Sequence, residues 1–447
     1  MIPLTQEQFR DALRKGKGRA LLHVHEFGGS GLEEDVLRAC EQSLVYDAQS
    51  EGTRSEWLYD IVTAAGLVEA VKPRVLAALE QPATMEQFWD VAQLYCLAAI
   101  FARNGHDDAR DAVYRKFDRK EFIEAWLGGI PLITADGLAG FLHVADVTGD
   151  RLANEPGYWD GGDCEYLFHE ACERLGEEAV TNALAEAAEK NANCRTFRDA
   201  IQKHQDDVRK YNEEQEEKKL QGRPLRERKC VEEVLQIVES SGPEAVGFLF
   251  WLRGASALEI QTVFERMLAE HRPMQLQRFL QMFRLCDMPR VDGRILQLAR
   301  TGPAELRGPC FDALGRIQDE RIHQLAHELL SQNPPMPEAI SLFRNNYESR
   351  DHAVIELALP RQGDDDVLHG IVLDLVKISD TAGSEFLYCL QWVYESSPCS
   401  CCRESAVRRM VDLQIAPQAI LHECLADSYE DTRKLATAAL AGTDAKE

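Results

Sequence analysis

The sequence predicts an all-α protein, and more specifically an α-solenoid in which paired antiparallel helices stack one after another. Apolar residues recur at three- and four-residue steps, for example at Phe141, Val144 and Val147, which is typical of amphipathic helices. Glycine or proline interrupts the chain at intervals of about 12 to 20 residues. The period of two that strands require is almost absent, except in the segment Leu21–Phe27, which fits either state.

Residues 1–205 are predicted to form an N-terminal helical-repeat domain. Within it, the stretch 89–117 shows two helical patterns separated by Gly105, as in a helix hairpin. The apolar run 91–102 is interrupted by Gln93 and is shorter than the ~18 residues that a membrane span needs. We therefore predict that this run is a buried core helix.

The segment 206–229 contains few large apolar residues and many charges of both signs. This composition predicts an exposed helix that ends near Leu220, followed by a turn at Gly222 and Pro224. The segment is either a hinge between two solenoid halves or one solvated helix of a continuous array, and we favour the hinge. The second domain would then span residues 230–447.

An internal repeat lies in this second domain. Residues 306–315 (LRGPCFDALG) align with residues 432–441 (TRKLATAALA), so that Arg307 corresponds to Arg433. Thirty residues before Arg433, Arg403 begins the same Arg-x-x-Ala pattern. Small residues on one helix face let the next helix approach closely. A period of about 30 to 45 residues of paired helices predicts a solenoid.

These segments resemble the HEAT-repeat family, especially its short form of the phycobilisome-lyase type. Residues 306–330 look like a full HEAT unit, with a helix, a turn that contains Asp319, and a second helix. Residues 403–426 and 429–441 look like a further unit and a last partial one. The resemblance covers about residues 305–441 and implies an α-solenoid. Because its motif is degenerate, it implies a fold and not an activity.

The composition excludes some classes of function. The chain has 447 residues, of which 45% are hydrophobic, and a formal net charge of −25. It is therefore long and apolar enough to bury a sizeable core. The negative charge disfavours a protein whose whole surface binds nucleic acid or an anionic membrane.

The N-terminal residues and the cysteines both predict a cytoplasmic protein. The first residues contain no basic stretch followed by an apolar run, as a secretory signal would. Thirteen cysteines, an odd number, are spread along the chain. We therefore expect a reducing compartment and mostly buried, free thiols.

The clearest candidate binding residues are arginines. Residues 253–321 contain 11 arginines, no lysine and 9 acids, unlike the acidic remainder. Guanidinium groups recognise phosphate or carboxylate in bidentate fashion, so a row of arginines on one face would bind an anionic partner. The alternative is that they form salt bridges between repeats. The candidates are Arg272, Arg278, Arg284, Arg290, Arg294 and Arg300.

The cysteine-rich segment 399–402 is a candidate metal or redox site. Cys399, Cys401 and Cys402 lie at the predicted start of a helix, where the helix dipole favours thiolate. An antiparallel hairpin would bring His422 and Cys424 near them and supply zinc ligands. However, positions two residues apart point about 200° from each other on a helix. We therefore expect core cysteines, and we predict neither a metal nor a cofactor.

No catalytic constellation is recognisable, and the predicted function is a scaffold or adaptor that binds a protein partner. Two alternatives follow from the family resemblance. One is a lyase or other modifying factor that acts on a protein-bound group. The other is a nucleic-acid-binding or base-excision protein that uses the arginines of residues 253–321, which the charge of −25 disfavours. The sequence leaves the oligomeric state open.

Overall fold

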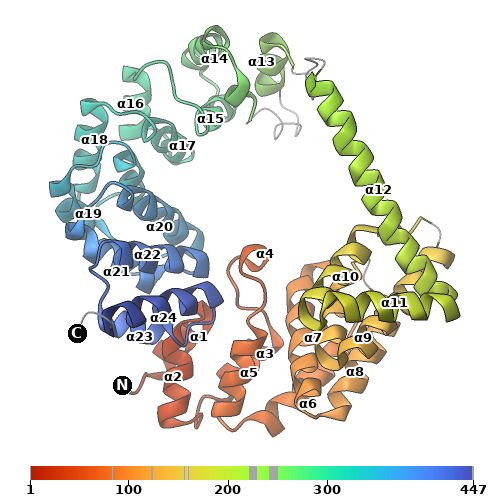
Figure 1. The fold of residues 1–447 in the computed structure, drawn as a ribbon. Coiled ribbons are helices and arrows are strands. Elements are labelled where there is room, and N and C mark those ends of the chain that lie inside the picture. Colours follow the sequence, from red (N-terminus) through yellow and green to blue (C-terminus); the bar gives the residue numbers. More distant parts are fainter. Residues whose placement is uncertain are drawn as a thin grey trace. The chain divides into compact units, whose positions relative to one another are not determined.

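The described residues form helices joined by turns, with no strand among them (Figure 1), which confirms the all-α prediction. The segment that fitted either state in sequence lies in helix α2 (Gly18–Phe27). The computed structural model describes residues 2–82, 84–121, 124–155, 157–159, 161–220, 229–240 and 250–444.

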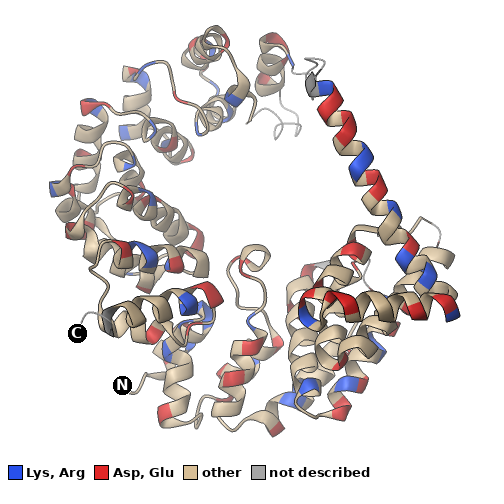
Figure 2. Ribbon diagram, viewed as in Figure 1, with Lys and Arg blue, Asp and Glu red and all other residues tan. Residues whose placement is uncertain are grey.

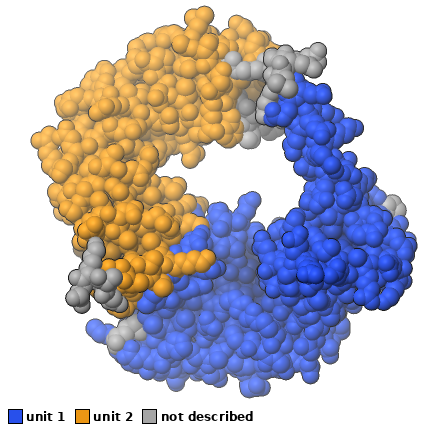
Figure 3. Space-filling model, viewed as in Figure 1, with its two compact units in different colours: residues 1–225, 423–433 blue, residues 226–422, 434–447 orange. Residues whose placement is uncertain are grey.

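The chain divides into two compact units (Figure 3). Unit 1 comprises residues 1–225 and 423–433, and unit 2 comprises residues 226–422 and 434–447. The first division falls inside the segment 206–229, where sequence composition changes.

Helix α12 (Ala192–Leu220) runs unbroken across residue 205, so the predicted limit of the N-terminal domain falls within a helix. Its acidic and basic residues alternate along its length (Figure 2). The exposed helix expected through Leu220 is therefore present. The turn expected at Gly222 and Pro224 lies outside the described residues.

Unit 1 is formed by a succession of helices in chain order. Their bounds are α1 (Gln6–Lys15), α2, α3 (Glu33–Glu41), α4 (Ala48–Glu51), α5 (Ser55–Ala64), α6 (Val68–Leu79), η1 (Met85–Gln87), α7 (Phe88–Arg103), α8 (Asp107–Asp118), α9 (Trp126–Asn154), α10 (Gly161–Leu175), α11 (Glu177–Lys190) and α12.

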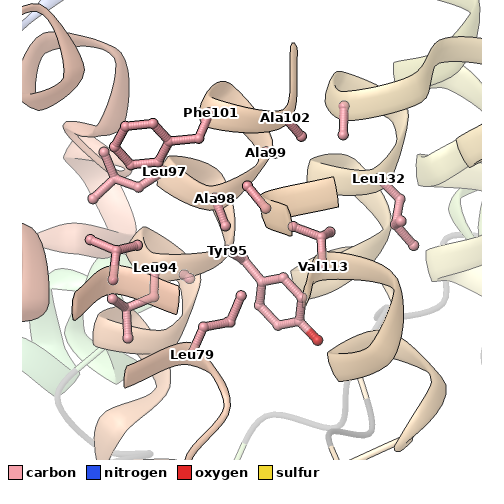
Figure 4. Packing of buried hydrophobic residues seen from close by; sticks show 14 of the residues in the cluster. Leu79, Leu94, Tyr95, Leu97, Ala98, Ala99, Phe101, Ala102, Val113 and Leu132 are labelled. Atoms are coloured by element: carbon pink, nitrogen blue, oxygen red, sulfur yellow. The ribbon is translucent and has the colours of Figure 1, made fainter. Parts of the chain in front are cut away.

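Helix α7 lies at the centre of the core of unit 1, as its apolar sequence predicts. Leu97, Ala98 and Ala99 are completely buried, and α7 packs against α5, α6, α8 and α9. Figure 4 shows the ring of Tyr95 on the same helix beside Val113 of α8. A helix that is apolar on all sides is stable only where neighbours surround it, which accounts for this position.

Gln93 explains why a polar residue interrupts the apolar run. Its side chain is buried, and its amide nitrogen donates hydrogen bonds to three carbonyl oxygens at the end of α3. These carbonyls would otherwise have no partner inside a helix. They belong to Ala39, Cys40 and Gln42, at 2.8, 3.1 and 3.1 Å.

Helix α9 is long and apolar enough, by length and composition, to cross a membrane, but 56% of its apolar window is buried inside the structure. The helix is also broken at Gly137, whose φ of 57° and ψ of −128° are not helical. Glycine adopts such a positive φ without steric cost. A Cβ at Gly129 would lie 3.2 Å from Val144, so the two halves pack against each other. These features are those of a core element of unit 1.

Residues 423–433 pack against the first helices of unit 1. The indole nitrogen of Trp57 donates to the carbonyl of Ala426 at 2.9 Å, and the amide of Ser428 donates to the carbonyl of Gly16 at 2.9 Å. Arg19 forms an ion pair with Glu423 at 2.7 Å. The sequence places this segment in the C-terminal domain, whereas its contacts place it in unit 1.

Unit 2 is also helical in its described residues, and short 3₁₀ turns join many of its helices. Acidic or hydroxyl side chains begin several helices, since Ser256, Asp292, Asp319 and Asp364 each accept a hydrogen bond from the first turn. The bounds are α13 (Val231–Glu239), η3 (Trp251–Gly254), α14 (Ala257–Ala269), α15 (Pro273–Met282), α16 (Gly293–Thr301), α17 (Ala304–Leu314), α18 (Glu320–Leu330), η4 (Pro337–Phe343), η5 (Ser349–Asp351), α19 (His352–Ala358), α20 (Asp365–Ser379), η6 (Ser384–Phe386), α21 (Leu387–Ser396) and α22 (Ser400–Asp412). Helices α23 (Gln418–Cys424) and α24 (Glu430–Asp444) each contain residues of both units.

Candidate functional site

All six candidate arginines have intramolecular partners within unit 2. Three pair with acids on neighbouring helices, one pairs with an acid two residues away, and two donate to backbone carbonyls. The partners are Glu270 for Arg272, the carbonyls of Val238 and Ser240 for Arg278, Asp312 for Arg284, Glu265 for Arg290, the carbonyls of Met267, Leu268 and Glu270 for Arg294, and Glu328 for Arg300.

Arg294 shows how these contacts work. It lies in the first turn of α16, and its guanidinium donates to carbonyl oxygens that end helix α14. Arg278 of α15 does the same at the end of α13. A cation at a helix C-terminus satisfies unpaired carbonyls and interacts favourably with the helix dipole. The second interpretation of these arginines, as ties between helices, accounts for these contacts. The anion-binding row remains a prediction.

Arg272 is held by a carboxylate that is itself tightly bound. Glu270 accepts hydrogen bonds from the amides of His271 and Arg272, at 2.8 and 2.7 Å, and from the Arg272 guanidinium at 2.6 Å. The hydrogen bond from the Arg272 side chain is the main cause that lowers the pKa of Glu270 to about 2. The carboxylate therefore stays ionised in neutral solution and occupies this guanidinium.

The cysteine segment forms a cluster with a histidine from another helix of unit 2. Cys399 is the N-cap residue of α22, Cys402 lies in its first turn, and His369 lies on α20. The three ligand atoms lie within 4.8 Å of one another, and the Cys402 thiol is 3.4 Å from Nε2 of His369. Cys399 and Cys402 are only 5% and 8% exposed.

Two of the five cysteine and histidine candidates from the sequence belong to this cluster. Cys401 lies on the same turn but is not among the three clustered ligands. His422 belongs to unit 2 and Cys424 to unit 1. The sequence analysis missed His369, and it also missed that Cys399 and Cys402 stand in C-x₂-C spacing, which is a common signal of metal ligands.

A second cluster in unit 2 was not predicted at all. His323 and His327 lie one turn apart on α18, and each Nε2 contacts one oxygen of Asp351, at 3.0 and 2.8 Å. The Asp351 carboxylate is completely buried and also accepts a hydrogen bond from the amide of Glu348 at 2.6 Å. The H-x₃-H spacing, which places both rings on one helix face, was the available signal.

Unit 1 contains a cavity of about 580 Å³ between α5, α7 and residues 425–433. Its lining includes Trp57 and charged groups of both signs, among them Asp60, Arg174 and Arg433. Burial, and then the neighbouring Glu56 carboxylate, raises the pKa of Asp60. This mixture of charges does not indicate one class of ligand.

Comparisons with protein-family models, with curated proteins and with solved structures found no match to this chain.

Proposed function

We propose that unit 2 is an α-solenoid of HEAT-like helix pairs and that the chain is a scaffold or adaptor that binds a protein partner. The observation that supports this proposal is the sequence separation of side-chain contacts between helices. Five arginines of unit 2 each contact a group 27 to 30 residues away. The pairs are Arg266 with Glu239, Arg300 with Glu328, Arg316 with Asp287, Arg344 with Asp374, and Arg409 with the carbonyl of Ser379.

A constant separation of about 30 residues is what a one-dimensional array of repeats requires. In such an array each repeat contacts only its neighbours, so long-range contacts cluster at one repeat length. The separation also equals the spacing of Arg403 and Arg433 in the sequence repeat. Arrays of this kind present extended surfaces, and such surfaces are commonly used to bind other proteins.

Two exposed apolar side chains give the proposed partner a place to bind. Leu357 of α19 is 85% exposed and Tyr388 of α21 is 55% exposed. Helices α19 and α21 pack against each other, and the two residues are about one repeat apart in sequence. Single exposed apolar residues are common. Two at equivalent repeat positions on packed helices form a surface that a partner would cover.

The experiment is affinity capture followed by a binding titration. The full-length protein is used as bait in extracts of cells that make it naturally, and each captured protein is then purified and titrated against it. The double variant Leu357→Lys with Tyr388→Lys is expected to bind the partner at least about tenfold more weakly, because charge replaces the apolar anchors.

Leu258→Lys is the matched control, since Leu258 is 77% exposed on α14, elsewhere in unit 2. This variant is expected to bind like the unaltered protein. Equal binding by the double variant would rule out the α19–α21 surface. The absence of any protein that binds the purified chain directly would contradict the scaffold function itself.

A further inference from the structure

We propose that His369, Cys399 and Cys402 bind a zinc ion that joins α20 to the N-terminal turn of α22. The three side chains come from two helices that pack against each other within unit 2. Their ligand atoms converge within 4.8 Å. This proposal goes beyond the scaffold function, because it assigns a metal ion and a structural role to a place that the scaffold function does not use.

The geometry matches a tetrahedral zinc site. With a Zn–S bond of about 2.3 Å and a Zn–N bond of about 2.05 Å, tetrahedral ligands place sulfur about 3.6 Å from nitrogen. The Cys402 thiol lies 3.4 Å from Nε2 of His369. An ion could therefore be bound with side-chain adjustments of a few tenths of an ångström, and neither helix needs to move.

The ligand chemistry favours zinc over magnesium or calcium. Two thiols and an imidazole are soft or borderline ligands, whereas magnesium and calcium require carboxylate or carbonyl oxygen. On binding, each thiol releases one proton to solvent, so that two thiolates and a neutral imidazole hold the dication. A water molecule or a further side chain would complete the fourth position.

The position of the cysteines on α22 supports thiolate formation. Cys399 is the N-cap residue and Cys402 lies in the first turn, where backbone amides and the helix dipole stabilise a negative charge. The C-x₂-C spacing at the start of a helix is also the usual way in which one chain segment supplies two zinc ligands.

Burial distinguishes this cluster from a reactive thiol site. A nucleophilic or redox-active cysteine must be reached by its substrate, but Cys399 and Cys402 are 5% and 8% exposed. A structural zinc ion needs no such access, because the ion is enclosed during folding.

The second cluster of unit 2 is a weaker candidate for metal binding. The Asp351 carboxylate there receives two imidazole contacts and one backbone amide, at 2.6 to 3.0 Å. These hydrogen bonds already satisfy the buried carboxylate, so that cluster is explained without an ion. It serves instead as an internal control.

The test is the metal content of the full-length protein, purified without a metal-affinity tag and with a thiol-free reductant. We expect about one zinc per chain by inductively coupled plasma mass spectrometry. His369→Ala and Cys402→Ser are each expected to lower this at least about tenfold. Cys401→Ser, on the same turn, and His327→Gln, in the other cluster, are expected to keep the ion.

A ligand exchange separates metal binding from folding. His369→Cys is expected to retain the metal and, after replacement by cobalt, to show a stronger thiolate-to-cobalt charge-transfer band than the unaltered protein. Circular dichroism of each variant checks that helix content is unchanged. Less than about 0.2 zinc per chain in the reduced, folded protein would overturn the proposal. So would loss of zinc in Cys401→Ser but not in His369→Ala, or a Cys399–Cys402 disulfide in the purified protein.

Discussion

The arginines of unit 2 act one at a time, each satisfying groups that helix formation leaves unpaired. Arg294 covers the end of α14, and Arg409 donates to the carbonyl of Ser379 at the end of α20. The sequence showed that this region contains arginine without lysine. It could not show which carbonyl or acid each guanidinium reaches, because that depends on how the helices pack.

The cysteines differ in the same residue-specific way. Burial raises the pKa of the Cys40 thiol and of the Cys310 thiol to about 12, so these two are inert core residues. The structure records all thirteen cysteines as free, in agreement with the thiol state expected from the sequence. Only a contact between helices separates Cys402 from the others, and sequence spacing alone does not reveal its partner His369.

Glu270 allows a prediction about acid stability. Its pKa is lowered to about 2 in the folded protein and is near 4.3 in an unfolded chain. Because the folded pKa is the lower one, the ionised carboxylate stabilises the fold above about pH 4, and this contribution is lost as the pH falls towards 2. Glu270→Gln is therefore expected to lower the free energy of unfolding by about 2 kcal/mol at neutral pH.

The measurement is urea unfolding of the unaltered protein and the variant from about pH 7 down to about pH 3, where their difference is expected to shrink. Glu305→Gln changes an exposed glutamate of the same unit and serves as control. A difference between Glu270→Gln and the unaltered protein that stays constant with pH would show that the carboxylate charge is not the cause.

At the scale of helices, the periodicity of the sequence predicted the elements better than their ends. The core helix predicted over residues 91–102 is α7, and the exposed charged helix is the end of α12. The assignment of residues 423–433 to unit 1 was not predictable. Nothing local marks a segment that packs on helices about 400 residues earlier, since local patterns carry no long-range pairing information.

Gly18 marks the place where this distant segment packs on unit 1. It is the first residue of α2, and a Cβ there would lie 1.9 Å from the carbonyl oxygen of Glu423. Backbone cannot give way as a flexible side chain does, so Gly18→Ala is expected to destabilise the protein by about 1–3 kcal/mol. Amide hydrogen exchange within residues 423–433 is expected to accelerate.

Gly293 provides the matched control. It is likewise the first residue of a helix, α16, and a Cβ there would meet no atom within 4 Å. Gly293→Ala should leave both stability and exchange nearly unchanged. If the two variants behave alike, the close packing of Gly18 on residues 423–433 is not what holds that segment.

At the scale of the whole chain, composition and periodicity were enough for the fold class but not for the sites. Helical patterns and the absence of alternation predicted an all-helical chain, which the described residues confirm. The two clusters of unit 2 each join residues that lie about one repeat apart, such as His323 and Asp351. Predicting them requires the repeat register, and the degenerate repeat motif fixes that register only where Arg and Ala recur.

The account depends most on unit 2 being an array of repeats in which each helix pair is stabilised by its neighbours. The most direct measurement is amide hydrogen exchange across unit 2 in Leu325→Ala. Leu325 lies on α18 and is 1% exposed, and its truncation is expected to cost about 2–5 kcal/mol. In a repeat array exchange accelerates in α18 and its neighbours α16, α19 and η4, while α13 and α22 remain as in the unaltered protein. Equal acceleration throughout unit 2 would contradict the repeat array and with it the proposed scaffold.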